Sequence, residues 1–369
     1  MKFQSMAVLA LSVLAGHASA QEKWVIGQSA PLSGGNAAFG KDIRDGANAY
    51  FASINAKGGV QGRQVELVTL DDKNDRATAA ANTKTLLETR NPLALFGYAS
   101  ATLSLDAMPQ AEAREVAFFA PFSGAEPVRG KSPVLFTMRA SYGEEMDKML
   151  AFWMSLGLKR VTVVHYDDQV GKQNLEVVAQ TLKKSNLTPQ SLPLKRNAPV
   201  GKPEAQALVG TNPEFIINTV LSGAAASLQK ELAGLGKMIP TSSLSFVGAD
   251  QFIAAAGPLS AGVSIAQVVP NPTSSLPVVR ECARAMEAAG SKTPMNSTQL
   301  EACMGAKVLA EGIRRARKPV NAQSVLEALQ GLGSYDLGGF KVTFNKGEQH
   351  GSRFVELAMV TKDGKITSR

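Results

Sequence analysis

Runs of residues with strand-like and helix-like spacing alternate along almost the whole chain. An extended apolar run at 25–27 precedes apolar residues at helical spacing from Phe39 to Ile54, and the same order then repeats. After about residue 140 the alternation starts again, with the buried-strand run RVTVVHY at 160–166 and a helical pattern over 171–184. Repeated β-α units predict a parallel sheet covered by helices on both faces. Two consecutive sets therefore predict an α/β fold with two doubly wound lobes of similar build.

The first residues have the pattern of a cleaved secretory signal. Lys2 precedes a short apolar stretch, and Ala18-Ser19-Ala20 comes before the polar residues that begin at Gln21. A positive start, an apolar run too short for a stop-transfer helix and a small-residue cleavage site are typical of a signal peptide. We therefore expect residues 1–20 to be removed and the mature protein to reside in the periplasm. A retained membrane anchor is the alternative.

Composition narrows the classes of partner. Hydrophobic residues make up 44% of the chain and charged residues 19%, which is typical of a globular protein with a sizeable core. The formal net charge is +8, but lysines and arginines are scattered, with little aromatic interleaving. A nucleic-acid surface needs a continuous basic face. We therefore interpret the charge as a solvated basic surface, and we expect a monomer with no nucleic-acid partner.

The two cysteines, Cys282 and Cys303, both fall in helical patterns separated by a short polar connection. In an oxidising compartment they are candidates for a disulfide that joins adjacent helices. Two buried free thiols are the alternative.

Signals for catalysis, metals and cofactors are weak. Beyond the signal, histidine occurs only at His165 and His350, and no Gly-x-Ser-x-Gly, CxxC, HExxH or EF-hand pattern occurs. The Ser/Gly-rich stretch at 29–43 lacks the Gly-Lys-Ser/Thr ending of a P-loop. In LDDKNDR, Asp75 is placed to cap a helix, and the two acids before it suit a solvated turn better than a metal site. We therefore expect no cofactor, no metal and no enzymatic activity.

Candidate binding residues follow from the position of loops in such a fold. Ligands of open α/β sheets bind beyond the carboxyl ends of the strands, which here selects the loops at 29–40, 98–102, 121–125, 165–170, 220–222 and 248–250. Ser100 or Thr102 caps a helix start, where hydroxyls and free N–H groups can bind a carboxylate; capping alone is the alternative. Ser123 and Gly124 offer a hydroxyl and an open amide. Asp250 could pair with an ammonium group or only cap a helix.

The stretch from Ile26 to Asp75, with its PLSG and INAKGG segments, resembles the start of the Leu/Ile/Val-binding proteins. These are periplasmic receptors of branched-chain amino acid ABC transporters, and the resemblance extends over essentially the whole mature chain. It implies a type I periplasmic-binding fold, in which three crossovers join two lobes around a ligand cleft. The crossovers are then expected near 139–140, 269–270 and 346–350. One lobe would comprise 23–139 plus 271–345, and the other 140–270 plus 346–369.

The resemblance also implies roles for single residues. Phe39 matches the aromatic residue that covers the ligand. Tyr98 to Thr102 and Ser123 to Ala125 match segments that hold its carboxylate end, with Ala101 at the position of the family's serine. In the second lobe, Val170 and either Leu221 or Ser222 replace tyrosines, and Asp250 or its neighbour matches the glutamate that binds the ammonium. The predicted ligand-binding residues are Phe39, Tyr98, Ser100, Ala101, Thr102, Ser123, Gly124, Val170, Ser222 and Asp250.

These observations predict an exported solute-binding protein of an ABC importer. It would capture a small carboxylate-bearing ligand, an amino acid or a related compound, and deliver it to an inner-membrane permease. A ligand-sensing subunit for a signalling receptor is one alternative, and a secreted α/β enzyme is another. Recognition of an amine depends on Asp250 alone, so an organic acid or amide is a competing ligand class.

Overall fold

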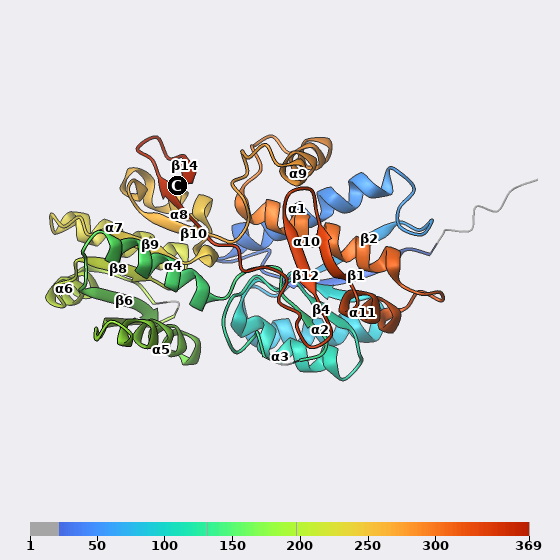
Figure 1. Cartoon of the computed structure of the whole chain (residues 1–369), viewed down its shortest axis with the longest axis horizontal. Coiled ribbons are helices and arrows are strands. Elements are labelled where there is room, and N and C mark those ends of the chain that lie inside the picture. The colour runs from blue at the N-terminus through green and yellow to red at the C-terminus, as the bar shows by residue number, and fades with distance from the viewer. Residues whose placement is uncertain (1–21, 131, 197, 369) are drawn as a thin grey trace, which may run out of the picture.

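The computed structural model describes residues 22–130, 132–196 and 198–368, so the predicted signal peptide lies outside the described residues. Within them, the strands form sheets of five and seven strands and a separate two-stranded hairpin. The elements around these two sheets lie side by side along the long axis of the molecule (Figure 1). We call the part with the five-stranded sheet the first lobe and the part with the seven-stranded sheet the second lobe.

The first lobe contains a parallel sheet with the strand order β2-β1-β3-β4-β5. Its strands are β1 (Trp24–Ala30), β2 (Val65–Asp71), β3 (Ala94–Phe96), β4 (Ala117–Phe119) and β5 (Leu135–Phe136). Its other elements are α1 (Ala37–Asn55), α2 (Arg76–Thr89), α3 (Ala101–Glu112), α9 (Pro277–Ala288), α10 (Ser297–Arg315), α11 (Ala322–Gln330) and the hairpin of β11 (Gly333–Asp336) and β12 (Lys341–Phe344). Strand β1 is buried along nearly its whole length, as a parallel strand covered on both faces must be.

The second lobe has the strand order β14-β13-β10-β9-β8-β6-β7, in which β13 and β14 pair antiparallel at one edge. Its strands are β6 (Val161–Tyr166), β7 (Gln190–Leu194), β8 (Phe215–Asn218), β9 (Thr241–Ser243), β10 (Ser264–Gln267), β13 (Glu356–Val360) and β14 (Ile366–Ser368). Its helices are α4 (Tyr142–Ser155), α5 (Gln169–Lys183), α6 (Lys202–Gly210), α7 (Ser222–Gly234), η1 (Ser245–Val247), α8 (Ala249–Ala256) and η2 (Gly257–Ser260). Both lobes are therefore α/β units, as predicted.

The chain passes between the lobes in three segments, at 137–141, 268–276 and 345–355. Each segment contains one of the predicted crossings, and the two-lobed fold with three crossovers is confirmed. The exact limits of the lobes stay a prediction.

Polar caps set the helix starts that face the sheet edge. The Asp75 carboxylate accepts a hydrogen bond from the Thr78 N–H at the start of α2, and Ser100 Oγ accepts one from the Leu103 N–H at the start of α3. Both caps satisfy N–H groups that a helix leaves without intrahelical partners. The predicted capping roles of Asp75 and Ser100 are confirmed.

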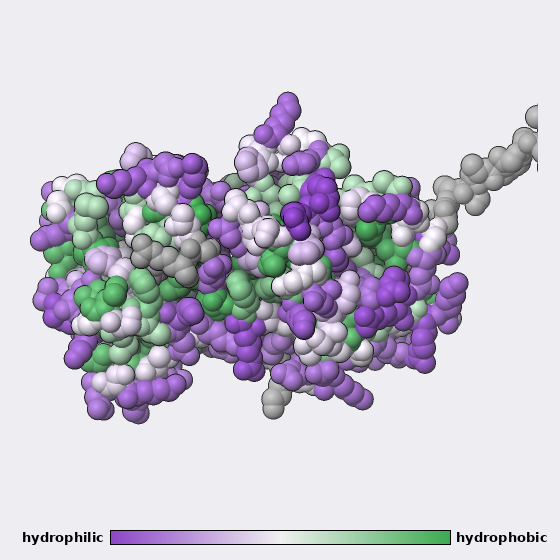
Figure 2. Space-filling view, turned by 45° about the horizontal axis from the view of Figure 1, so that its top comes forward, coloured by the Kyte–Doolittle hydropathy of each residue, from purple (hydrophilic) through white to green (hydrophobic). Residues whose placement is uncertain are grey.

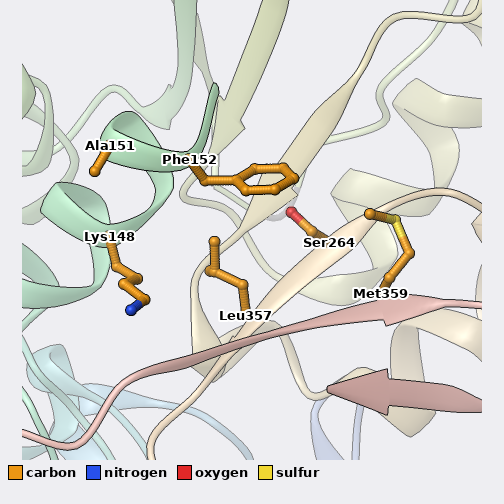
Figure 3. Close-up of a pocket in the computed structure, with 6 residues that line it drawn as sticks. All are labelled: Lys148, Ala151, Phe152, Ser264, Leu357 and Met359. Carbon is orange, nitrogen blue, oxygen red and sulfur yellow. The ribbon is translucent and has the colours of Figure 1, made fainter. Parts of the chain in front are cut away.

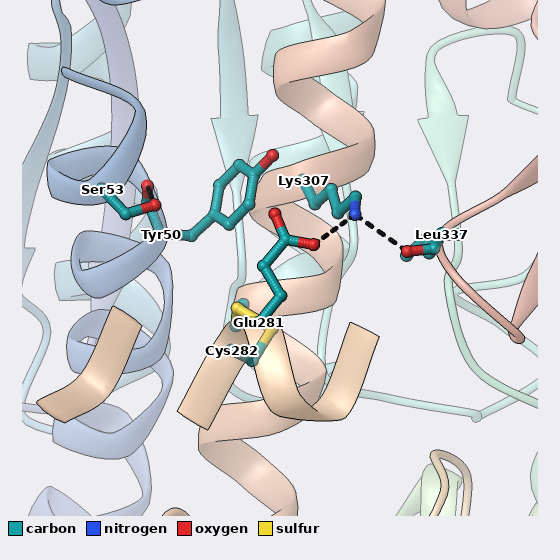
Figure 4. Close-up of a disulfide and its surroundings, with 7 residues drawn as sticks. Tyr50, Ser53, Glu281, Cys282, Lys307 and Leu337 are labelled. Atoms are coloured by element: carbon teal, nitrogen blue, oxygen red, sulfur yellow. Dashed lines mark hydrogen bonds and ion pairs between the residues drawn. A yellow bond between two sulfur atoms is a disulfide. The ribbon is translucent and has the colours of Figure 1, made fainter. Parts of the chain in front are cut away.

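A disulfide joins Cys282 of α9 to Cys303 of α10, and both side chains are fully buried. Close by, Lys307 Nζ donates to a Glu281 carboxylate oxygen and to the Leu337 carbonyl (Figure 4). Helix α10 in turn packs along α1. These contacts hold the late helices to the helix that follows the first strand, although the two lie far apart in the sequence.

No helix in the described ranges has the length and apolar character to cross a membrane. On the face in Figure 2, hydrophilic residues are spread over both lobes, with smaller hydrophobic patches between them.

Candidate functional site

A continuous cleft is lined by residues of both lobes. It consists of an inner chamber of about 60 Å³ and an outer groove of about 390 Å³. The chamber and the groove share Asn36 and Asn74 from the first lobe and Tyr166 and Leu221 from the second. A ligand in this cleft would therefore contact both lobes at once.

The lining residues come from the carboxyl ends of parallel strands in both sheets. Because neighbouring parallel strands end at the same edge, the loops that follow them meet in space. The lining includes Asn36 after β1, Asn74 after β2, Ser100 after β3, Tyr166 at the end of β6, Arg196 after β7, Leu221 after β8 and Phe246 after β9. The rule that selected the candidate loops therefore describes the site that the structure contains.

Five of the predicted ligand-binding residues line the cleft. Ser100, Ala101, Thr102 and Val170 line the inner chamber, and Ser222 lines the outer groove. The hydroxyls of Ser100 and Thr102 are 3.1 Å apart at the start of α3. This helix start combines hydroxyl groups with the positive end of a helix dipole, an arrangement that suits an anionic group.

Phe39 and Tyr98 lie in the first-lobe core instead. The Phe39 ring is buried and packs edge-on against Phe122, with the ring centroids 6.0 Å apart. The Tyr98 hydroxyl shares a 2.7 Å hydrogen bond with the Thr83 hydroxyl, and its ring packs on Phe118. Neither is among the described residues that line the cleft. Phe39 lies in the first turn of α1 and Tyr98 two residues after the end of β3, and both rings pack on phenylalanines of the first lobe.

Ser123 and Gly124 support the first crossing between the lobes. A Cβ atom at Gly124 would lie 2.7 Å from the Ala140 carbonyl oxygen, so the close approach of the two backbones requires glycine. The Gly124 carbonyl accepts a hydrogen bond from the Tyr142 N–H, and Ser123 Oγ lies 3.4 Å from the Tyr142 hydroxyl. The structure therefore uses both residues to position Tyr142, whose side chain lines the inner chamber.

Asp250 lies in the first turn of α8, where the surrounding protein raises the pKa of its carboxyl although part of the residue reaches solvent, and it is not among the described residues that line the cleft. It lies near Asp42 of α1, whose pKa is raised by burial and also by the Asp250 charge. The neighbouring Gln251 donates a 2.6 Å hydrogen bond to the Asp42 carboxylate. This part of α8 therefore contacts α1 across the lobes, away from the cleft.

Sequence reasoning missed the loops after β2 and β7. The first contributes Lys73 and Asn74, and the second contributes Lys195 and Arg196. The Arg196 guanidinium stacks over the Tyr166 ring, 3.9 Å from its centroid. The signal that could have found these residues is the strand-end rule itself, applied to every strand of both sheets.

A buried charge network connects the lobes at the first crossing. Arg139 donates to both Glu301 carboxylate oxygens, at 2.8 and 2.6 Å, and to Ser245 Oγ at 3.2 Å. Ser245 also donates to Glu145 through its N–H and its hydroxyl. Burial opposes the charge of Arg139, but Glu301 raises its pKa; burial raises the pKa of Glu145 to about 7. This network holds the crossing in place, and its residues are not among the described ones that line the cleft.

A second groove, of about 340 Å³, lies between α4 and the strands β10 and β13 (Figure 3). Its lining combines Phe152, Leu357 and Met359 with Lys148. All of these residues belong to the second lobe, so movement of the lobes toward each other cannot enclose a ligand there.

Three comparisons place the chain among known proteins. A family model described as "Periplasmic binding protein" matches residues 23–365. The Leu/Ile/Val-binding protein homolog 7 of Brucella melitensis is 26% identical over 396 residues, which cover 98% of this chain and 95% of the relative. A substrate-binding periplasmic protein from Ralstonia solanacearum has a similar structure, with a TM-score of 0.88, 31% identity and coverage of 94% of this chain and 99% of that one.

The isoleucine complex of the branched-chain amino acid transporter substrate-binding protein LivJ from Streptococcus pneumoniae is also similar. Its TM-score is 0.82 at 17% identity, with coverage of 94% of this chain and 99% of that one. At this identity the likeness is one of fold.

Proposed function

The chain belongs to the periplasmic binding protein family, as its resemblance to the Leu/Ile/Val-binding proteins predicted, and on that premise we propose that it is a solute-binding protein of an ABC importer. In this proposal the protein is exported to the periplasm, captures a small carboxylate-bearing ligand between its lobes and delivers it to an inner-membrane permease. It acts by binding, without catalysis.

The observation that carries this proposal is the cleft with lining residues from both lobes. A ligand that contacts both lobes stabilises the closed arrangement over the open one, because only the closed form makes both sets of contacts. The hydrogen bond from Gln251 of α8 to Asp42 of α1 is one contact between the lobes that such a movement would form or break. A closed shape gives a permease a surface that signals an occupied cleft.

The start of α3 supports a carboxylate as the shared feature of the ligand. Ser100 and Thr102 present hydroxyls to the inner chamber at a helix start. Hydrogen bonds to a charged group contribute about 1.5–3 kcal/mol each, so a few convergent bonds suffice for micromolar affinity.

The positions of the histidines support binding without catalysis. His165 is buried in β6 with its Nδ1 within 2.9 Å of the Tyr166 carbonyl oxygen, and His350 Nδ1 lies 3.0 Å from the Thr137 hydroxyl. Neither is among the described residues lining the cleft. A general base would have to reach a ligand that lies there.

Native mass spectrometry of the protein as purified tests the proposal. We expect a small molecule that stays bound under native conditions and dissociates on unfolding, and its mass identifies its class. Small-angle X-ray scattering before and after removal of that molecule should show a smaller radius of gyration for the occupied form. Chemical conversion of the bound compound by the protein would refute a role limited to binding.

A matched pair of threonine variants tests the site. Thr102→Ala should weaken binding of the retained compound by about 1 kcal/mol, because it removes one hydroxyl from the chamber. The control is Thr85→Ala, which removes an exposed hydroxyl from α2 that bonds only to the Ala81 carbonyl of its own helix. Equal affinity of the two variants would place the ligand outside the inner chamber.

A further inference from the structure

The charged side chains that line the cleft are all cationic. Among the described residues, Lys73 and Lys195 line the outer groove and Arg196 lines the inner chamber, while no aspartate or glutamate lines either part. The Nζ atoms of both lysines make no hydrogen bond or ion pair with the rest of the described chain. Such a cleft attracts anions and offers a ligand ammonium group no counter-charge.

The protein holds the Arg196 side chain in place but does not use all of its N–H donors. Its Nε and Nη2 donate to one Asp168 oxygen at 2.9 and 2.7 Å, and its guanidinium carbon lies over the Tyr166 ring, 3.9 Å from the ring centroid. Nη1 makes no hydrogen bond within the described residues, so it is available to a ligand. A fixed guanidinium matches the planar geometry of a carboxylate.

The Asp168 carboxylate beside the chamber is already paired with protein donors. Asp168 Oδ2 accepts both bonds from Arg196, and Oδ1 accepts the Gly171 N–H at 2.9 Å as the cap of α5. Asp168 therefore uses three of its roughly four acceptor sites on the protein, and the Arg196 charge already balances its own, so it offers an ammonium group no free counter-charge.

The carboxylates of Asp71 and Asp72, which precede Asn74, also accept hydrogen bonds from the protein. Asp71 accepts from the Leu32 and Lys73 N–H groups and from the Ser33 hydroxyl, and Asp72 accepts from Ser29 Oγ and the Asn74 N–H. Their hydrogen bonds shape the turn after β2, and the charged residue of this turn that lines the outer groove is Lys73.

We propose that the ligand is an organic anion without a positively charged amino group, and that Arg196 binds its carboxylate in the inner chamber. This inference rests on the proposed function, since it names the ligand class of the same cleft. The body of the ligand lies against Tyr142, Tyr166 and Phe246, whose rings line the chamber. An α-amino acid is disfavoured, because its ammonium group would lose water without gaining a carboxylate partner.

Matched pairs of compounds test this class directly. The probes are leucine against 4-methylpentanoate and phenylalanine against 3-phenylpropanoate, measured by calorimetry on protein freed of ligand by unfolding and refolding with the disulfide intact. Each pair differs only in the amino group. We expect the acid without an amine to bind at least about tenfold more tightly in one or both pairs, a difference of about 1.4 kcal/mol. An amino acid that binds as tightly as its partner, or more tightly, overturns the proposal.

If none of the probes binds at millimolar concentration, the chemical class of the compound retained on the purified protein tests the inference. A retained compound with an amino group overturns the inference and leaves the binding-protein function intact, whereas an amine-free carboxylate supports both. No binding and no retained compound contradicts the inference and the proposed function together.

Arg196→Gln separates a direct role from a structural one. We expect it to weaken the tightest-binding amine-free probe about tenfold or more, since a charged hydrogen bond is lost. The change also frees the Asp168 oxygen beside the chamber, so the preference for amine-free acids should narrow or reverse. A purely structural role would weaken both members of a pair equally, which would overturn the assignment of Arg196.

Two further variants serve as controls. Arg160→Gln removes an exposed arginine of the second lobe that also pairs with a carboxylate, Glu214, and it should leave affinity and preference unchanged. Asp250→Asn should leave the preference between the members of each pair unchanged, because Asp250 lies outside the cleft lining and its effect on the Asp42 contact between the lobes acts on both members alike. A selective loss of amino acid binding in Asp250→Asn would show that Asp250 binds an ammonium group and would overturn the proposal.

Discussion

Arg139→Met should destabilise the protein by about 3–5 kcal/mol, because it leaves a buried carboxylate without its partner. Arg139 is 2% exposed and Glu301 6%. The guanidinium donates to the Glu301 oxygens at 2.8 and 2.6 Å, and these are the hydrogen bonds that this carboxylate makes with the described residues. Glu145 also loses a cation that favours its charged form. The variant therefore leaves two buried acidic groups without the guanidinium that favours their charged forms.

The matched control removes both members of the pair. Arg139→Met combined with Glu301→Met removes the Glu301 charge together with its partner, apolar side chains of similar length fill the space, and Glu145 keeps its two Ser245 donors. Replacement of a buried ion pair by apolar residues is often close to neutral, whereas removal of one partner is not. We therefore expect the double variant to recover most of the stability that the single variant loses.

The two tryptophans allow the effect to be assigned to each lobe. Trp24 lies in β1 of the first lobe and Trp153 in α4 of the second, and these are the tryptophans of the chain. Urea unfolding followed by fluorescence in the Trp24→Phe and Trp153→Phe backgrounds reports each lobe separately. Because Arg139 bonds to Glu301 on α10 and to Ser245 beside β9, we expect both transitions to shift.

The loss of unfolding free energy in Arg139→Met should also depend on pH. A buried carboxyl without a counter-charge has a pKa above its usual value, so its contribution to stability is retained at acid pH and lost as pH rises. The single variant should therefore approach the wild type as pH falls toward 5. A loss below about 1 kcal/mol at neutral pH, or a double variant as unstable as the single one, would refute this account of the crossing.

Three further predictions concern other charged or covalent contacts. Replacing Cys282 and Cys303 with serine should lower the free energy of unfolding by about 3 kcal/mol in urea titrations, since the bridge closes a loop with a sequence separation of 21. Burial raises the pKa of Glu145 from 4.5 to about 7 in the folded protein. The contribution of this group to stability is therefore full below pH 4.5 and is lost as pH rises through about 7. Glu145→Gln lacks this titration, so its free energy of unfolding relative to that of the wild type should rise as pH increases from 4.5 to about 7, which thermal unfolding can measure. Gln251→Ala removes the hydrogen bond to Asp42 and should increase the radius of gyration in small-angle scattering; an unchanged radius would show that this contact does not bias the lobes.

The alternation of apolar runs predicted most elements because buried parallel strands and amphipathic helices produce distinct apolar spacings. Strand β9 has no such signal. It consists of Thr241, Ser242 and Ser243, all buried, and hydroxyls satisfy the polar groups around it: Ser242 accepts from the Trp153 ring N–H and Ser243 from the Asn218 amide. Strand β7 carries Pro193, which is tolerated because β7 lies at the edge of the sheet. Neither property can be derived from apolar spacing.

The sequence predicted part of the cleft lining, namely the loops after those strands that the apolar pattern indicated. The loops after β3, β6 and β8 were identified, and Ser100, Val170 and Ser222 from these loops line the cleft. Arg196 was missed because it follows β7, a strand that the pattern did not indicate. Ser123 was assigned to the ligand from its loop position and from the resemblance, and its hydroxyl lies 3.4 Å from that of Tyr142 at the crossing. Pairing between distant segments decides such roles, and a local pattern does not contain it.

The partners of the two arginines explain why one stabilises the fold and the other is available for binding. Arg139 is almost fully buried, and its Nε, Nη1 and Nη2 atoms all bond to residues on other elements. Arg196 is partly exposed and uses Nε and Nη2 on a single Asp168 oxygen, while its Nη1, at the chamber wall, has no hydrogen-bond partner among the described residues. An unused donor on a fixed side chain is stable only where water or a ligand can reach it. The cleft therefore combines a guanidinium that the protein orients with a donor that water satisfies in the empty cleft and that the proposed anion would satisfy in the occupied one.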